Sequence, residues 1–165
     1  MFMNSIILIG MPGAGKSTVG VILAKALGLR FIDTDILIQE RTGRVLQDIL
    51  DRDGYQEFTK YEEETILSLH PHHAVIATGG SVVRSDAAMA HLKSLGVVFY
   101  LRISFHEMEK RLSNITTRGI VLLPGQSLRD MYNERAPLYE KYADITIECT
   151  DEDFESVVAR VIAGL

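Results

Sequence analysis

A glycine-rich segment near the N-terminus carries the residue types that bind phosphate. It reads Gly10-Met11-Pro12-Gly13-Ala14-Gly15-Lys16-Ser17-Thr18 and fits the pattern G-x-x-x-x-G-K-[ST] at every fixed position. Glycines let backbone N–H groups turn inward around phosphates, because no Cβ stands in the way. In this pattern the lysine reaches the β- and γ-phosphates and the serine offers its hydroxyl to Mg²⁺. The segment therefore predicts a nucleoside triphosphate site made by Gly13, Ala14, Gly15, Lys16, Ser17 and Thr18.

The flanking residues predict the strand and the helix that this pattern needs. Residues 5–9 form a short apolar run rich in β-branched side chains, which is typical of a buried strand. After the loop, apolar residues recur at helical spacing until Gly28, which is a typical helix stop. The start of that helix adds a partial positive charge beside the phosphates. A turn that fits the pattern by chance would need neither the strand nor the helix, so their presence favours a phosphate-binding loop.

The rest of the chain alternates between strand and helix patterns. Further strands are expected at 29–32, 74–78, 97–101 and 145–148, and further helices at 85–95, 104–113, 126–141 and 151–165. Ser104 and Glu107 have the spacing of a capping box. This order predicts an α/β fold of the P-loop NTPase type: a three-layer, doubly wound, parallel five-stranded sheet in one domain over 1–165. Ligands of such sheets collect beyond the carboxyl ends of the strands.

Composition limits the classes of partner. The chain has 165 residues, of which 47% are hydrophobic and 24% charged, and its net charge is −5. It therefore has no general attraction for nucleic acid or anionic membranes. The single cysteine, Cys149, excludes an intrachain disulfide and fits a reducing compartment. The apolar N-terminus lacks a basic leader, and no apolar run has membrane-spanning length, so we expect a cytoplasmic protein.

Two carboxylates follow the second expected strand. Asp33 and Asp35 lie two residues apart beside the predicted phosphate site. Asp33 is a candidate for the Mg²⁺ shell, and Asp35 is a candidate to accept a hydrogen bond or a proton from an attacking hydroxyl. The alternative is that one of them only caps a helix starting at Ile36.

Three further segments contain candidate ligands. The pair Gly79-Gly80 follows the third strand and permits close backbone approach, although an ordinary turn would also explain it. A polar lid is expected over 113–125, where Arg118 would stabilise charge on the transferring phosphoryl group, or would be an ordinary solvated arginine. Arg135 is either a bidentate partner for a carboxylate or a surface residue. The acidic run 62–64 is interpreted as an exposed helix face.

Together these motifs resemble the shikimate kinase family of P-loop proteins nearly from end to end. The resemblance is carried by Gly10–Thr18, Asp33-Thr34-Asp35, Thr78-Gly79-Gly80, Arg118 and Arg135-Ala136-Pro137-Leu138-Tyr139. It implies transfer of the ATP γ-phosphoryl group to the 3-hydroxyl of shikimate, in aromatic amino-acid synthesis, and it suggests a monomer. It also implies phosphate contacts for Lys16 and Arg118, Mg²⁺ contacts for Ser17 and Asp33, and acceptor contacts for Asp35, Gly80 and Arg135. Arg111 would lie against the adenine.

Three departures from the family pattern fall on the acceptor side. In the expected acceptor-binding segment, 33–61, Thr59 stands where the family has an arginine that grips the carboxylate of shikimate. Lys60 is the neighbouring cation and is counted with the substrate-binding residues, but it cannot copy a bidentate fork. Ser81 replaces a third glycine, and Arg118-Gly119 replaces Arg-Pro. Losing one charge-assisted contact costs about 1.5–3 kcal/mol. A kinase of another small hydroxylated acid, or a nucleotide-binding homologue without catalysis, therefore stays open.

Overall fold

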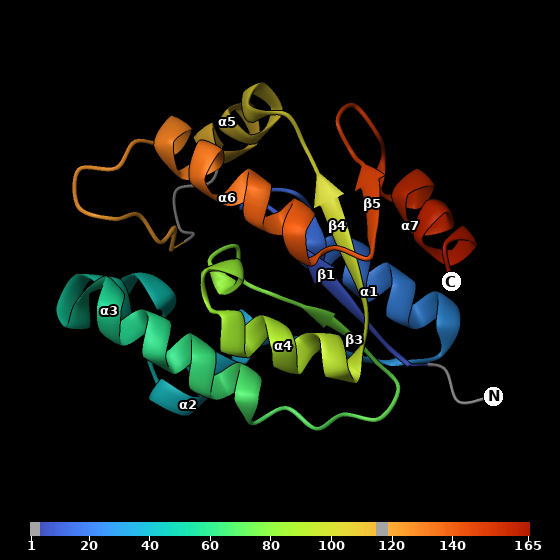
Figure 1. The fold of residues 1–165 in the computed structure, drawn as a ribbon, viewed down its shortest axis with the longest axis horizontal. Helices are drawn as coiled ribbons and strands as arrows, with labels where there is room; N and C mark the ends of the chain where they lie inside the picture. The colour runs from blue at the N-terminus through green and yellow to red at the C-terminus, as the bar shows by residue number, and fades with distance from the viewer. Residues whose placement is uncertain (1–3, 115–118) are drawn as a thin grey trace.

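The computed structural model describes residues 4–114 and 119–165, and a five-stranded sheet lies at its centre (Figure 1). Its strands are β1 (Ser5–Ile9), β2 (Arg30–Asp33), β3 (Ala74–Ala77), β4 (Gly96–Arg102) and β5 (Ile145–Glu148). They lie in the order β2-β3-β1-β4-β5, and each neighbouring pair is parallel. Ile7 of the central strand β1 aligns with Ile76 on one side and Val98 on the other. The five strands confirm the predicted fold class.

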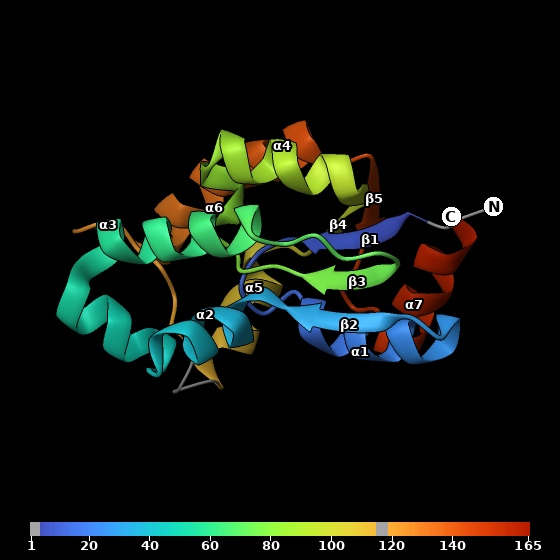
Figure 2. The same cartoon turned by 90° about the horizontal axis from the view of Figure 1, so that it is seen from below.

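Helices cover both faces of this sheet. The helices are α1 (Lys16–Leu27), α2 (Thr34–Thr42), α3 (Leu46–Leu67), α4 (Asp86–Leu95), α5 (Phe105–Ser113), α6 (Leu128–Tyr142) and α7 (Phe154–Ala163), with a 3₁₀ turn η1 (Val82–Arg84). Figure 2 shows α1 and α7 on one face and α4 and α6 on the other. All five residues of β1 are buried, which explains its continuous apolar run. Within the described ranges, no helix is long and apolar enough to cross a bilayer.

Capping residues explain the small shifts between expected and observed helix starts. The helices expected from residues 85 and 104 each begin one residue later, because Ser85 and Ser104 are N-caps whose side chains accept from Ala88 N at 3.0 Å and Glu107 N at 3.1 Å. A capping role had been predicted for Ser104. The capping box expected at Ser104 is only half made. The carboxylate of Glu107 accepts a hydrogen bond from Arg111 Nε at 2.7 Å instead, and Arg111 also contacts the loop between β1 and α1.

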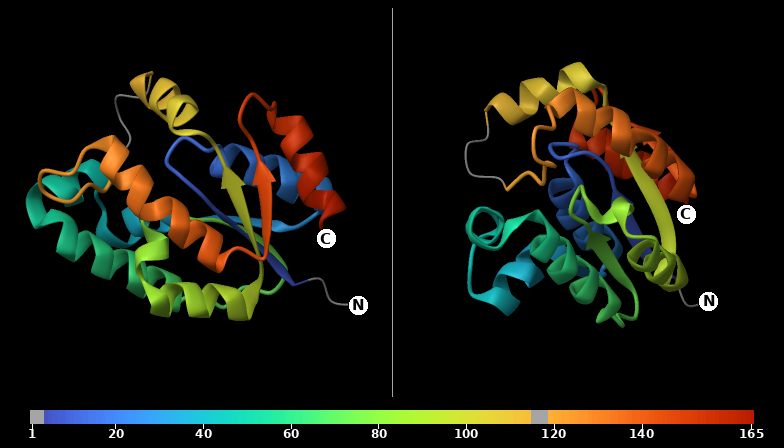
Figure 3. Two further views of the ribbon diagram at one scale, coloured as in Figure 1. Left: turned by 45° about the horizontal axis from the view of Figure 1, so that its top comes forward. Right: turned by 60° about the vertical axis from the view of Figure 1, so that its left-hand side comes forward.

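Helices α2 and α3 form a separate lobe beyond the carboxyl ends of the strands (Figure 3). Helix α3 is interrupted at Gly54, whose φ of 80° and ψ of 171° are not helical, and its second half therefore runs in a new direction. The lobe has a small hydrophobic core of its own, and Val121 from the segment before α6 belongs to it. The members of this lobe core are Ile38, Leu46, Ile49, Phe58 and Val121.

Candidate active site

The phosphate loop joins β1 to α1 and leaves the start of that helix uncovered. Its N-cap is Gly15, with a φ of 93°, and Gly13 has a φ of 81°. Both values lie in the region that favours glycine. A Cβ on Gly15 would come within 2.7 Å of the Phe154 ring. Because the first turn of α1 contains no acidic residue, its N–H groups favour an anion.

Two cations hold the carbonyl groups of this loop. Lys16 is only 8% exposed, and its Nζ donates to Gly10 O at 2.7 Å and to Met11 O at 2.8 Å. On the other side, Arg111 Nη1 donates to Gly13 O at 3.0 Å. The two side chains keep positive charge against the loop, where a polyphosphate would need it. The structure thus brings Arg111 to the nucleotide site from a position far along the sequence.

Ser17 and Asp33 meet at the end of β2. Ser17 Oγ donates to Asp33 Oδ2 at 2.6 Å, while Asp33 Oδ1 accepts from Asp35 N at 3.0 Å and from Ile36 N at 3.3 Å. Asp33 therefore caps α2, which begins at Thr34, and also faces the phosphate loop. The hydroxyl and carboxylate oxygens fit Mg²⁺, which takes few protein ligands beside phosphates and water. Among residues 4–114 and 119–165, no three His, Cys, Asp or Glu residues gather as a metal cage.

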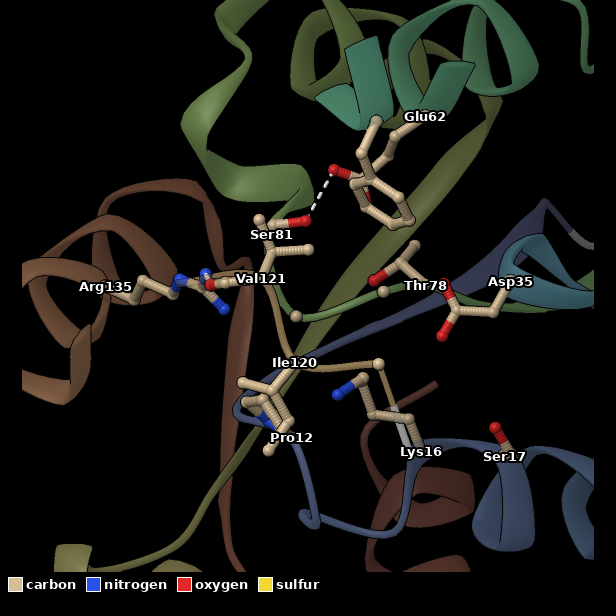
Figure 4. A pocket seen from close by; sticks show the side chains of 14 residues that line it. Pro12, Lys16, Ser17, Asp35, Glu62, Thr78, Ser81, Ile120, Val121 and Arg135 are labelled. Carbon is tan, nitrogen blue, oxygen red and sulfur yellow. Dashed lines mark hydrogen bonds between the residues drawn. The ribbon is translucent and has the colours of Figure 1, made fainter. Parts of the chain in front are cut away.

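A hollow of about 520 Å³ lies between the phosphate loop and the lobe of α2 and α3 (Figure 4). Side chains from several elements of the fold converge on it. The polar and glycine residues that line it are Lys16, Ser17, Asp35, Glu62, Thr78, Gly79, Gly80, Ser81, Gly119 and Arg135. The predicted residues Lys16, Ser17, Asp35, Gly79, Gly80 and Arg135 thus lie around one space.

The glycines at the end of β3 are needed where they stand. A Cβ on Gly79 would come within 2.7 Å of both Asp35 Oδ1 and Glu62 Oε2. A Cβ on Gly80 would come within 2.9 Å of Pro12 Cδ. The two carboxylates therefore approach the backbone of Gly79 closely, and the turn lies directly against the phosphate loop.

Glu62 is a site residue that the sequence analysis missed. The acidic run 62–64 was interpreted as exposed, which is wrong for Glu62, because its side chain is buried with 4% exposure. Its Oε1 accepts from Ser81 Oγ at 2.7 Å, and no described residue bonds its Oε2. Burial, and then the charge of Asp35, raise the pKa of Glu62 to about 7, against the bond from Ser81 and the charges of Arg135 and Arg84. A signal was present, since Phe58 and Ile66 flank Glu62 at four-residue helical spacing.

Ser81, which replaces the third glycine of the family pattern, is buried. Its hydroxyl turns toward α3 and bonds Glu62, so this departure from the family pattern creates a buried side-chain contact. The pair is drawn with its hydrogen bond in Figure 4. Glu62 and Ser81 both line the hollow, on the side of α3, which we call its acceptor end.

Arg135 is a buried cation and not a surface residue. It is 2% exposed on α6, and its Nη2 donates to Val121 O. Its Nε has no hydrogen-bond partner among the described residues. A buried guanidinium with an unused N–H group beside a hollow is suited to bind an anionic ligand. Tyr139, one turn further along α6, donates to Gly80 O and fixes the helix against the glycine turn.

The remaining candidates lie at the edge of the hollow or outside the described residues. Lys60 is 64% exposed and pairs with Glu57 at 2.5 Å, so its charge is already engaged at the surface. Arg118 lies outside the described residues. The segment that follows it lines the hollow through Gly119, Ile120 and Val121. A Cβ on Gly119 would come within 2.9 Å of Leu46 Cβ, which explains the small residue there.

Comparison with known proteins gives a consistent result. The shikimate kinase family model matches residues 12–165. A shikimate kinase of Mycobacterium tuberculosis is 38% identical over 96% of this chain and 92% of its own length, and one of Thermodesulfovibrio yellowstonii is 39% identical over 97% and 94%. A solved shikimate kinase from Acinetobacter baumannii in complex with shikimate has a TM-score of 0.89 and 32% identity over 97% of this chain and 91% of that one.

Proposed function

This chain belongs to the shikimate kinase family, and from that premise we propose that it transfers the γ-phosphoryl group of ATP to a hydroxyl of shikimate. One observation carries the proposal. The phosphate loop and the carboxylate of Asp35 border the same hollow of about 520 Å³, in which Arg135 supplies a cation for an acid. A donor phosphate and an acceptor hydroxyl can therefore be held together, which is the main requirement of phosphoryl transfer.

On the donor side, the proposed roles follow from charge and position. The N–H groups at the start of α1 and the ammonium of Lys16 bind the phosphates, and Arg111 holds the loop and borders the nucleotide. Ser17 and Asp33 would hold Mg²⁺, which neutralises phosphate charge when it is bound. Arg118 is proposed to stabilise the charge that spreads over the phosphoryl oxygens.

On the acceptor side, Asp35 accepts the hydrogen bond of the attacking hydroxyl and orients its lone pair toward the phosphate. Arg135 binds the carboxylate of the acid through its guanidinium, which lines the hollow and whose Nε has no partner among the described residues. Gly79 and Gly80 let the acceptor lie close to the main chain, because any side chain there would collide with Asp35, Glu62 or Pro12. Lys60 is proposed as a long-range cation at the rim of this end.

We further propose a cytoplasmic monomer, because ATP is the donor and the hollow is formed within one chain. The experiment for the monomer is light scattering after gel filtration of the purified chain. A mass near 18.4 kDa supports this part of the proposal, and a stable mass of twice that value contradicts it.

A second acceptor has one observation in its favour. Thr59 lacks the guanidinium that the family resemblance leads one to expect, and Ser81 bonds Glu62 in the same region. Both changes lie at the acceptor end, and the phosphate loop keeps its full pattern. A kinase of another small hydroxylated acid would show these features as well.

An ADP-release assay distinguishes these functions. The chain is incubated with Mg²⁺-ATP and, in separate reactions, with shikimate, quinate, gluconate or homoserine. We expect shikimate to give the highest kcat/KM. ADP release with another acid alone would identify the second candidate. ATP binding measured by calorimetry, without turnover of any acid, would contradict a kinase function altogether.

A further inference from the structure

A second hollow, of about 560 Å³, adjoins the first at the acceptor end. Glu62 and Ser81, which are joined by a hydrogen bond, are among the residues that line both hollows. The first hollow contains Arg135 and the second contains Thr59 and Arg84. Position 59, where the expected guanidinium is missing, therefore faces the same space as an arginine from a different element.

Contacts from two helices hold Arg84 in place. Its Nε lies 2.9 Å from Glu134 Oε1 on α6, and its Nη2 donates to Tyr55 Oη on α3 at 3.4 Å. The guanidinium also lies over the Tyr55 ring, 5.1 Å from its centroid. Its side chain is 21% exposed. A guanidinium fixed in this way loses little conformational entropy when it binds an anion.

Neither neighbour of Arg84 supplies an equivalent group. Thr59 Oγ1 donates to Gln56 O of its own helix at 2.8 Å. Lys60 also lines the second hollow, but it is paired with Glu57 and its side chain is 64% exposed, against 21% for Arg84. Among the described residues that line either hollow, Arg84 is therefore the fixed, partly buried guanidinium on the side of position 59.

Electrostatics link Arg84 to the acceptor hollow. The charges of Arg135 and Arg84 both act to lower the pKa of Glu62, although burial of that carboxyl raises it overall. Both guanidiniums therefore act on the same buried carboxyl group, which lines both hollows. A carboxylate placed near Glu62 would meet positive charge from both arginines.

We propose that Arg84 is the second cation of the acceptor site, and that it and Arg135 together hold the carboxylate of the acceptor where the two hollows meet. The inference rests on the proposed function, because it takes the acceptor to be an acid. Arg84 thus replaces, from η1, the guanidinium that Thr59 cannot provide from α3.

The experiment compares steady-state kinetics of the wild-type chain with Arg84→Ala and Arg84→Lys. We expect Arg84→Ala to raise the KM for shikimate about 10- to 100-fold, the effect of losing one charge-assisted bond, with the KM for ATP unchanged. Arg84→Lys keeps the positive charge but lacks the bidentate guanidinium, so it should raise the KM for shikimate less than Arg84→Ala does. Arg52→Ala is the matched control, because Arg52 is 71% exposed on α3 and forms a surface ion pair with Asp48.

Two further measurements test whether the contact is with the carboxylate. With the neutral carboxamide of shikimate, wild type and Arg84→Ala should have equal kcat/KM, because no charge remains to be bound. Thr59→Arg added to Arg84→Ala should restore most of the lost affinity. Thermal unfolding of each variant separates a change in the KM for shikimate from a loss of folded protein. If Arg84→Ala does not fold, Arg84→Lys takes its place in these measurements.

Each contrary result has one meaning. If wild type turns over shikimate and neither Arg84 variant raises its KM, this inference is wrong and the proposed function stands. If Lys60→Ala raises the KM instead, the second cation is Lys60. If wild type does not turn over shikimate under saturating Mg²⁺-ATP, the proposed function fails first.

Discussion

The two ends of the active site are built in different ways. At the phosphate end, the proposed ligands are main-chain N–H groups at the start of α1, and the side chains of Lys16 and Arg111 hold loop carbonyls at 2.7–3.0 Å. At the acceptor end, the proposed ligands are side chains from distant elements, namely Asp35 of α2 and Arg135 of α6. A main-chain site is fixed by one local pattern, whereas a side-chain site can change by single substitutions.

The two ends also rest on different packing. The phosphate loop extends from β1, whose residues belong to the main hydrophobic core. The acceptor lobe rests on a second core of five buried side chains. Of the two departures, Thr59 follows Phe58 of this second core, whereas Ser81 directly precedes Val82 and Val83 of the main core.

The largest effect is expected from Lys16→Ala. Removing the ammonium takes away a positive charge that would stabilise the transferring phosphates, so we expect kcat to fall about 10³-fold or more. A coupled ADP-release assay measures it. Lys25→Ala, on the exposed side of the same helix, is the control and should retain activity. Full turnover by Lys16→Ala would show that Lys16 does not bind the transferring phosphates.

Arg118→Ala is expected to lower kcat by about 10²-fold, with a smaller change in the KM for either substrate. The reason is that charge on the phosphoryl oxygens grows during transfer, so an arginine there contributes most in the transition state. The same assay at saturating ATP and acceptor checks the value. An unchanged kcat would mean that Arg118 is an ordinary solvated side chain.

Glu62→Gln should remove a pH dependence of stability. The pKa of Glu62 is raised from 4.5 to about 7, so between these values the native state binds a proton that the unfolded chain has lost. The free energy of unfolding of wild type should therefore fall as pH rises through this window, by at most about 3 kcal/mol. The glutamine variant does not titrate there and should lack this fall.

Urea unfolding at pH 5 and pH 8 measures this difference. Glu64→Gln is the matched control, because Glu64 is exposed two residues further along α3. The control should keep the pH slope of wild type. Parallel slopes for wild type and Glu62→Gln would show that Glu62 is ionised normally.

The smallest effect is expected from Gly79→Ala. The added Cβ would displace the carboxylate ends of Asp35 and Glu62, which can each move by a small amount. We expect the KM for the acceptor to rise about tenfold and the KM for ATP to stay within twofold, in line with a modest loss of positioning. Equal effects on both substrates would show that the two ends are not separate.

Much of the fold could be predicted because its signals are local. The apolar run of β1 and the Gly28 stop of α1 are read directly from neighbouring residues, and both are confirmed. Helix starts were less accurate, because Ser85 and Ser104 fit both a cap and a first turn. The lobe was the weakest part, since the change of direction at Gly54 depends on tertiary packing.

The candidate site divides in the same way. The strand and helix on either side of the phosphate loop are confirmed, and Ser17 and Asp33 meet as their positions suggested, while phosphate binding by Lys16 stays a prediction. Glu62 was missed because a run of three acids favours exposure, although its helical spacing with Phe58 pointed inward. Arg84 gave no sequence signal, because only the arrangement of η1 beside α3 and α6 brings it to the acceptor end.

The membership of Val121 in the lobe core has a consequence for opening motions. With so few buried side chains, α2 and the first half of α3 should detach from the sheet at a lower free energy than the strands do. Their amide protons should then exchange with deuterium sooner than those of β1. The carbonyl of Val121 also accepts a hydrogen bond from Arg135, so an acid bound by that arginine should slow this exchange. Binding of the substrate could then be followed through the rate of amide exchange in α2 and the first half of α3.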